Sequence, residues 1–143
     1  MHAFQILNSE FRISMIRVVR LGTARAPDEG PRLGTVRRPP RGVRKEDIAR
    51  RDYYDVWAPE LAPSAPLVKD ALSEPWTEQR WASFARKYRA EMRDKAAGHL
   101  IAILAALSVR SSFSVGCYCE DESRCHRSIL REILADAGAV LIS

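Results

Sequence analysis

Short apolar runs along the chain alternate with longer stretches whose apolar residues have helical spacing. The β-branched run at residues 15–22 ends in a glycine, which is typical of a strand followed by a turn. Similar runs occur at residues 52–57 and 112–119, and residues 139–142 offer a final one. A short strand is also expected at residues 32–36, inside a proline- and glycine-rich region without a helical period.

Helical spacing dominates the second half of the chain. Trp81, Phe84 and Tyr88 recur at positions that share one face of a helix, which is typical of a helix packed on a core. Helices are expected at residues 65–72 with Ser64 as N-cap, at 81–92, at 99–109 after Gly98, and at 124–137 with Ser123 as N-cap.

Strands separated by helices require crossover connections, which place parallel strands side by side. We therefore expect an α/β fold: a three-layer, mostly parallel sheet with helices on both faces. Residues 15–143 are expected to form a single α/β domain. Residues 1–14 would be an N-terminal extension, for which the pattern leaves a strand, a helical turn and a loose arm open.

The composition excludes several classes of protein. With 143 residues, the chain is long enough to bury a core without disulfides. The longest stretch without charge or proline has 14 residues, too few to span a bilayer. Because three cysteines cannot all pair within one chain and no secretory leader is recognisable, we expect a cytoplasmic protein with free thiols and no membrane partner.

Positive charge is concentrated in the N-terminal third. The formal net charge is +5, but residues 12–51 alone carry 12 Arg and Lys against 4 Asp and Glu. The planar fork of arginine suits phosphates and carboxylates, so this third is a candidate surface for an anion or a nucleic acid. The plainer alternative is a solvated basic face, since arginine outnumbers lysine 19 to 4 along the whole chain.

The segment at residues 119–127 is the best candidate for chemistry. In an open parallel sheet, ligands bind beyond the carboxyl ends of the strands, where loops lead into helix N-termini. The same rule selects residues 22–25 after the first strand. The candidate catalytic residues are His126, Cys125 and Cys119, and the candidate anion-binding residues are Thr23, Arg25, Arg124 and Arg127.

Three interpretations of this segment remain open. In the first, Cys125 or Cys119 is a nucleophile of low pKa and His126 is a general acid or base. In the second, Cys117 joins these residues around zinc, but adjacent helical positions diverge by about 100°, which directs Cys125 and His126 apart. In the third, the polar residues only cap a helix. We assign no metal ligand and no cofactor.

Three carboxylates count against a phosphate site in this segment. Glu120, Asp121 and Glu122 would repel a phosphate unless they point outward, bind a cation or are offset by arginine.

Several motifs resemble one known family. They are Pro-Arg-Gly-Val at residues 40–43, the run from Tyr54 to Ser64 that ends in Leu-Ala-Pro-Ser, the aromatic helix at 81–92, and Cys125-His126-Arg127. In order and spacing they resemble the domain-of-unknown-function family 488, also called YeaO-like. The resemblance implies one small α/β domain in a bacterial-type cytoplasmic protein without an established activity. It also implies that the family's recurrent polar and aromatic positions fall here on Arg37, Arg41, Trp57, Pro63, Ser64, Tyr88 and His126, of which Arg37, Arg41 and Ser64 are further candidates for ligand binding.

Three functions remain open from the sequence. The favoured one is a pocket for a small anion or nucleotide at the carboxyl ends of the strands, with the Cys-His-Arg segment as its candidate for catalysis. The second is binding of nucleic acid or another polyanion by the Arg-rich third, for which no recognised motif is present. The third is a non-catalytic protein-interaction module.

Overall fold

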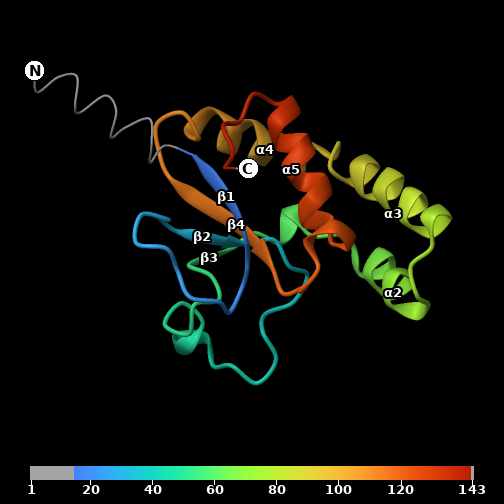
Figure 1. Cartoon of the computed structure of the whole chain (residues 1–143), viewed down its shortest axis with the longest axis horizontal. Helices are drawn as coiled ribbons and strands as arrows, with labels where there is room; N and C mark the ends of the chain where they lie inside the picture. Colours follow the sequence, from blue (N-terminus) through green and yellow to red (C-terminus); the bar gives the residue numbers. More distant parts are fainter. Residues whose placement is uncertain (1–14, 143) are drawn as a thin grey trace, which may run out of the picture.

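The computed structural model describes residues 15–142 and contains a four-stranded parallel sheet (Figure 1). The strand order is β1-β4-β2-β3. The predicted N-terminal extension, residues 1–14, lies outside the described residues. The expected final strand is reduced to one parallel bridge between Leu141 and Ile16. The strands are β1 (Ile16–Arg20), β2 (Arg32–Gly34), β3 (Val56–Trp57) and β4 (Phe113–Cys117).

Between residues 15 and 142, four α-helices and three single-turn 3-10 helices accompany these strands. Side chains of Ser64, Thr77 and Asp94 accept hydrogen bonds from backbone N–H groups in the first turns of α2, α3 and α4, as expected for N-caps. The α-helices are α2 (Ala65–Ser73), α3 (Glu78–Glu91), α4 (Lys95–Leu107) and α5 (His126–Asp136), and the 3-10 helices are η1 (Lys45–Asp47), η2 (Pro59–Leu61) and η3 (Glu122–Arg124).

The N-terminus of α4 differs from the sequence expectation. Gly98 was expected to separate two helices, but it lies inside α4, which begins at Lys95. Asp94 supplies the N-cap, and a single glycine costs a helix only about 1 kcal/mol relative to alanine. Packing of Ala97 and Ile101 in the core outweighs this cost.

The N-terminus of α5 also differs. Ser123 was expected to cap the helix and place three residues in its first turn. Instead, Asp121 accepts hydrogen bonds from the N–H and hydroxyl of Ser123, and these hydrogen bonds stabilise the separate turn η3. Cys125 follows with extended dihedral angles, φ −124° and ψ 149°, and is the N-cap residue of α5. Consequently Cys125 and His126 are not consecutive helical residues.

The α-helices described here share one apolar core with one face of the sheet. Residues of all four pack with Ile16, Phe113 and Val115, which by strand alternation point to the same face. Two crossover connections run in the same direction across the sheet. One leads from β3 to β4, and the other leads from β4 to Leu141, which pairs with the outer side of β1. Because crossovers are right-handed, both place their helices on that face (Figure 1).

The opposite face of the sheet is covered by connecting segments. A second apolar cluster contains Leu21, Val36, Ile48 and Tyr54, from the segments that connect the strands, and it extends past the carboxyl end of β4 to Cys117 and Cys125. The connection from β1 to β2 runs across the sheet in the other direction and contains no α-helix. The α/β class and the parallel sheet are thus confirmed, with the described α-helices on one face.

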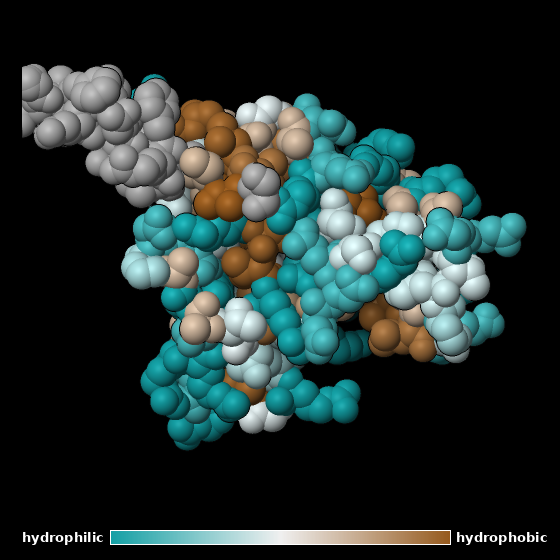
Figure 2. All heavy atoms as spheres, in the orientation of Figure 1, coloured by the Kyte–Doolittle hydropathy of each residue, from teal (hydrophilic) through white to brown (hydrophobic). Residues whose placement is uncertain are grey.

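The surface is mainly hydrophilic in the view of Figure 2, with one apolar area over the region of α4 and the C-terminal segment and another over the region of α2. Exposed apolar side chains of this region include Ile103, Leu107, Val109 and Val140. No helix among residues 15–142 is both long enough and apolar enough to cross a bilayer.

Candidate thiol site

The carboxyl ends of β1 and β4 lie side by side at one edge of the sheet. The backbone N–H of Leu21 donates to the carbonyl of Cys117 at 2.9 Å, and Nε of Arg20 donates to the carbonyl of Tyr118 at 3.2 Å. The hydroxyl of Thr23 donates to the carbonyl of Arg20 and so closes the turn after β1. The two segments selected from the sequence therefore lie at the same edge.

Three cysteine sulfurs and one imidazole gather at this edge. Sγ of Cys117 lies 3.8 Å from Sγ of Cys119, and Sγ of Cys125 lies 3.7 Å from Nδ1 of His126. Ligand atoms of Cys117, Cys125 and His126 all lie within 4.8 Å of one another. We call these four residues the thiol cluster; its donors are of the kind that bind thiophilic metal ions.

The imidazole of His126 is buried and oriented by Thr35. Its Nε2 lies 2.7 Å from the carbonyl oxygen of Thr35 and 3.0 Å from the hydroxyl of the same residue. A carbonyl only accepts hydrogen bonds, and the Thr35 hydroxyl donates its proton to Gly116, so Nε2 carries the hydrogen. In the neutral ring, the lone pair of Nδ1 therefore faces Cys125.

Arg127 connects the cluster to the backbone. Its side chain is 3% exposed; Nε donates to Sγ of Cys125 at 3.4 Å, and a terminal nitrogen donates to the carbonyl of Cys119 at 2.6 Å. Cys117 and Cys125 are buried, whereas Cys119 is exposed. A small molecule from solvent therefore meets Cys119 first.

The neighbouring thiols and the imidazole determine where negative charge rests in the cluster. Hydrogen bonds from Cys117 and Cys119 lower the pKa of Cys125, against the effect of burial, and His126 lowers it further. The pKa of Cys117 is raised by its hydrogen bonds to the other two sulfurs and by burial. Cys125 is thus the sulfur that most readily carries the charge.

A cavity of about 280 Å³ adjoins Tyr118, between Cys117 and Cys119 in the sequence, with two arginines in its lining. Arg20 comes from the end of β1, and Arg41 from the long loop after β2. Tyr118, which separates Cys117 from Cys119, forms part of the wall, and its hydroxyl donates to the carbonyl of Arg38. Arg41 is therefore the member of the predicted ligand-binding set that faces this cavity.

The three carboxylates of residues 120–122 are engaged by local partners. Glu120 lies 3.8 Å from Arg20, and Glu122 accepts a hydrogen bond from Arg131 at 3.0 Å. Asp121 accepts the capping hydrogen bonds of η3. Their repulsion of an anion is therefore partly offset by arginine and by the backbone.

Two predicted anion-binding arginines lie outside the cluster. Arg25 pairs with Asp52 and Asp55 at 3.2 and 2.7 Å. Arg124 stacks over the ring of Trp81, 5.3 Å from its centroid, and lies 3.5 Å from Glu78 on α3. Both arginines hold neighbouring segments together.

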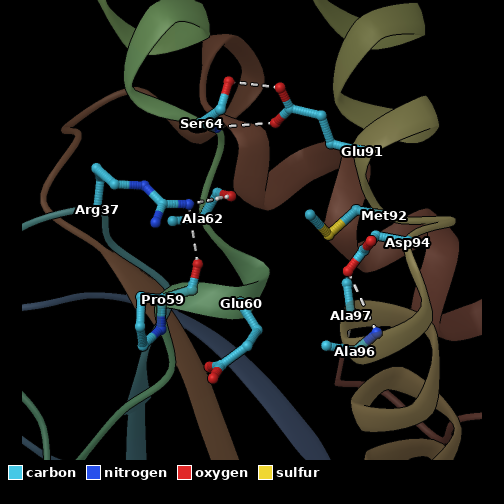
Figure 3. Close-up of a pocket in the computed structure, with 10 residues that line it drawn as sticks. All are labelled: Arg37, Pro59, Glu60, Ala62, Ser64, Glu91, Met92, Asp94, Ala96 and Ala97. Atoms are coloured by element: carbon cyan, nitrogen blue, oxygen red, sulfur yellow. Dashed lines mark hydrogen bonds between the residues drawn. The ribbon is translucent and has the colours of Figure 1, made fainter.

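Arg37 and Ser64 line a second cavity of about 570 Å³, between η2 and the N-terminus of α4 (Figure 3). Arg37 donates to the carbonyls of Pro59, Ala62 and Pro63. Ser64 donates from its hydroxyl and its backbone N–H to Glu91, at 2.5 and 2.8 Å. These contacts position the turn before α2 and account for both residues without a ligand.

Arg20 and Thr35 at the thiol site were not among the predicted residues, and Cys117 entered only through the zinc interpretation. Cys117 had a signal, because it alternates with Cys119 along a strand. Arg20 ends β1 and could have been selected by the rule for carboxyl ends. Thr35 had no sequence signal, since it acts mainly through its backbone carbonyl. Any residue in the same backbone conformation would supply that carbonyl.

Comparison with family models gives a match over residues 16–138 to the family described as the Active DUF488-N3 subclade. No curated protein and no solved structure matches the chain. The matched range begins with β1, ends after α5 and includes the whole thiol cluster. The resemblance inferred from the motifs is confirmed, and the chain belongs to the DUF488 family.

Proposed function

We propose that this protein is a thiol-dependent enzyme that transfers a group from a small anionic substrate through the sulfur of Cys119. The observation that carries the proposal is the thiol cluster, in which three sulfurs, an oriented imidazole and a buried guanidinium meet beyond the end of β4. A nucleophile, a base and a group that orients the base are the parts that covalent catalysis needs. The description of the matched subclade as active agrees with a catalytic role.

The cluster can move a proton away from Cys119. The hydrogen bond to Cys117 lowers the pKa of Cys119, but the hydrogen bond to Cys125 and burial outweigh it, so the net shift is upward and this thiol needs a base. Cys125, whose pKa is lowered, supplies that base, and its Sγ lies 3.7 Å from Nδ1 of His126. The proton of Cys119 passes to the sulfur of Cys125 and is shared there with His126. The thiolate of Cys119 then bonds to the electrophilic atom of the substrate, and the leaving group departs with its electron pair and takes that proton.

Water completes the reaction. Its oxygen attacks the transferred group, the sulfur of Cys119 leaves with the electron pair of the broken bond, and the proton of water returns to it. The products are the hydroxylated group and the original thiol, so one water is consumed in each cycle. His126 thus acts as the acid–base partner, in the role expected from the sequence.

Positive charge near Cys119 favours an anionic substrate. Arg20 and Arg127 hold the carbonyls on either side of the Cys119 side chain, those of Tyr118 and Cys119. Arg20 and Arg41 also line the adjacent cavity, so an anionic group bound there is attracted to both.

Alkylation with two reagents of different charge tests the proposal. We expect Cys119 to prefer iodoacetate, an anion, over neutral iodoacetamide by a rate ratio about tenfold higher than the ratio that glutathione shows. The ratio reports the arginines alone, because both reagents need the same thiolate and iodoacetamide gains nothing from a positive charge. Peptide mass spectrometry identifies the modified cysteine, and the protein is first freed of metal with a chelator.

A matched pair of arginine variants provides the control. Arg20→Gln should remove most of the preference for iodoacetate, whereas Arg110→Gln, at an exposed arginine before β4, should leave it unchanged. A rate ratio equal to that of glutathione would contradict the proposal.

The two alternatives have less support. Much of the basic third is engaged in ion pairs: Arg17 with Asp28, Arg25 with Asp52 and Asp55, Arg32 with Glu29, and Arg44 and Arg50 with Asp47. These pairs reduce the charge available to a nucleic acid. An interaction module would use the exposed apolar residues on α4, but nothing in the structure shows what covers them.

A further inference from the structure

We propose that the thiol cluster is also a binding site for a thiophilic divalent metal ion, with zinc as the expected occupant, and that the bound ion masks the thiols. The masking part rests on the proposed function, because it concerns the same sulfur. The binding part rests on the geometry of the cluster alone.

Two separations in the cluster match edges of a tetrahedral zinc site. Zinc lies about 2.3 Å from cysteine sulfur and about 2.0 Å from histidine nitrogen, which gives edges of about 3.8 Å between two sulfurs and about 3.5 Å between sulfur and nitrogen. The observed separations are 3.8 Å for Cys117 to Cys119 and 3.7 Å for Cys125 to His126. Cys117, Cys125 and His126 supply three ligands whose atoms lie within 4.8 Å of one another. Exposed Cys119, whose Sγ lies 3.8 Å from that of Cys117, is the nearest candidate for the fourth and closes onto the ion when it binds.

The imidazole is already oriented for coordination. Nδ1 of His126 faces the sulfurs, while the hydrogen on Nε2 is held by the carbonyl of Thr35. Metal-bound histidines commonly donate their other ring N–H to a carbonyl or carboxylate in this way, which fixes the tautomer and the ring orientation. No rotation of the ring is needed for binding.

Buried charge also balances when the site is filled. Three thiolates and one divalent ion leave a single negative charge on the cluster. The guanidinium of Arg127, buried beside Cys125, offsets that charge and donates to the sulfur. A pair of opposite charges is far less costly to bury than an isolated one.

Zinc was disfavoured from the sequence because α5 was expected to begin before Cys125, whereas it begins at His126. That expectation placed Cys125 and His126 at successive helical positions, which point in directions about 100° apart. Cys125 is instead the extended residue that precedes α5, and its side chain turns toward the side of the ring that carries Nδ1. The local conformation of one residue thus brings the two ligands together.

Cobalt titration of the full chain tests the binding. After reduction and removal of metal by a chelator, addition of Co²⁺ should produce thiolate-to-cobalt absorption and the intense visible bands of tetrahedral cobalt, saturating at one ion per chain. Zinc should then displace the cobalt. Absence of these bands with the wild-type chain would overturn the proposal without reference to any variant.

Variants locate the site. Loss of an outer-shell partner costs a metal site about 10- to 100-fold in affinity, so Cys117→Ser should cost at least about 100-fold. Cys119→Ser changes an exposed residue and is expected to fold; it should shift the cobalt spectrum toward fewer thiolate ligands. His99→Ala, at the exposed histidine of α4, should leave binding unchanged. An unchanged spectrum in Cys119→Ser would overturn its assignment as the fourth ligand.

The two proposals fail separately. If the metal-free chain shows the iodoacetate preference but binds no cobalt, the metal site is wrong and the thiol enzyme stands. If cobalt binds but the metal-free thiols react like glutathione, the enzyme proposal is wrong and the metal site stands. One equivalent of zinc should suppress alkylation of Cys119, and unchanged alkylation with zinc bound would overturn the masking.

Discussion

The buried guanidinium of Arg32, at the start of β2, is matched by backbone carbonyls and one carboxylate. Arg32 is 1% exposed and donates to Glu29 and to the carbonyls of Thr23, Ala24 and Asp52. Its contacts join the loop after β1 to the segment before β3. A buried donor without a partner would cost about 1–3 kcal/mol, so the carbonyls decide where such side chains can be buried.

Alanine substitution at two glycines should cost different amounts of stability. Gly30 and Gly42 have similar positive φ values, 79° and 75°. A Cβ at Gly30 would lie 2.0 Å from the carbonyl oxygen of Ser112, whereas one at Gly42 meets nothing within 4 Å. We expect Gly42→Ala to cost about 1 kcal/mol for the left-handed conformation alone. Gly30→Ala should cost about 3 kcal/mol or more, since it adds a clash with backbone.

Urea denaturation of the two variants measures the difference. Similar losses in both would show that the contact between the Gly30 turn and the start of β4 is looser than described.

Helix ends account for most differences between expectation and structure at the scale of elements. The apolar faces of α3 and α5 contain the predicted residues. The starts of α4 and α5 differ from the prediction, because Asp94 and Cys125 are their N-cap residues. Periodicity is repeated over several turns, but a helix end depends on one capping residue and its neighbours.

Replacement of Gly98 should stabilise α4. Gly98 lies inside α4, and a Cβ there would come no closer than 3.9 Å to the carbonyl of Met92. Gly98→Ala should therefore raise the free energy of unfolding by about 0.5–1 kcal/mol, because alanine has less backbone entropy to lose. Gly138→Ala, at the left-handed position after α5 with φ 96°, should lower it. Thermal and urea denaturation check both signs, and destabilisation by Gly98→Ala would contradict the assignment.

At the scale of the whole molecule, Asp55 links segments that are far apart in the sequence. Its carboxylate accepts hydrogen bonds from the side chain of Arg25 and the backbone N–H of Arg32. Burial raises the pKa of Asp55, but these hydrogen bonds outweigh burial and the net shift is downward. The folded state therefore binds this proton more weakly than the unfolded chain.

Asp55 should consequently contribute to acid sensitivity. Its stabilisation is present above the unfolded pKa of about 3.9 and is lost as the pH falls through the lower folded value. Asp55→Asn should reduce stability at pH 7 by about 1 kcal/mol, a value limited by solvent screening. It should also flatten the decline of stability between about pH 5 and pH 2. Urea denaturation across this range measures both effects, with Glu74→Gln as the control; parallel curves for Asp55→Asn and wild type would contradict the assignment.

The sequence by itself determined the α/β class, the core stripes of the helices and the segment that holds Cys119, Cys125 and His126. These features are encoded in residues close together along the chain, where alternation and helical spacing can be recognised. Only the packed molecule shows that Thr35 orients an imidazole 91 positions away and that Cys125 turns toward His126. It also shows that Arg20, rather than Arg25, contacts the backbone between Cys117 and Cys119. Such contacts depend on strand order and on where helices begin, which arise from packing across the whole chain.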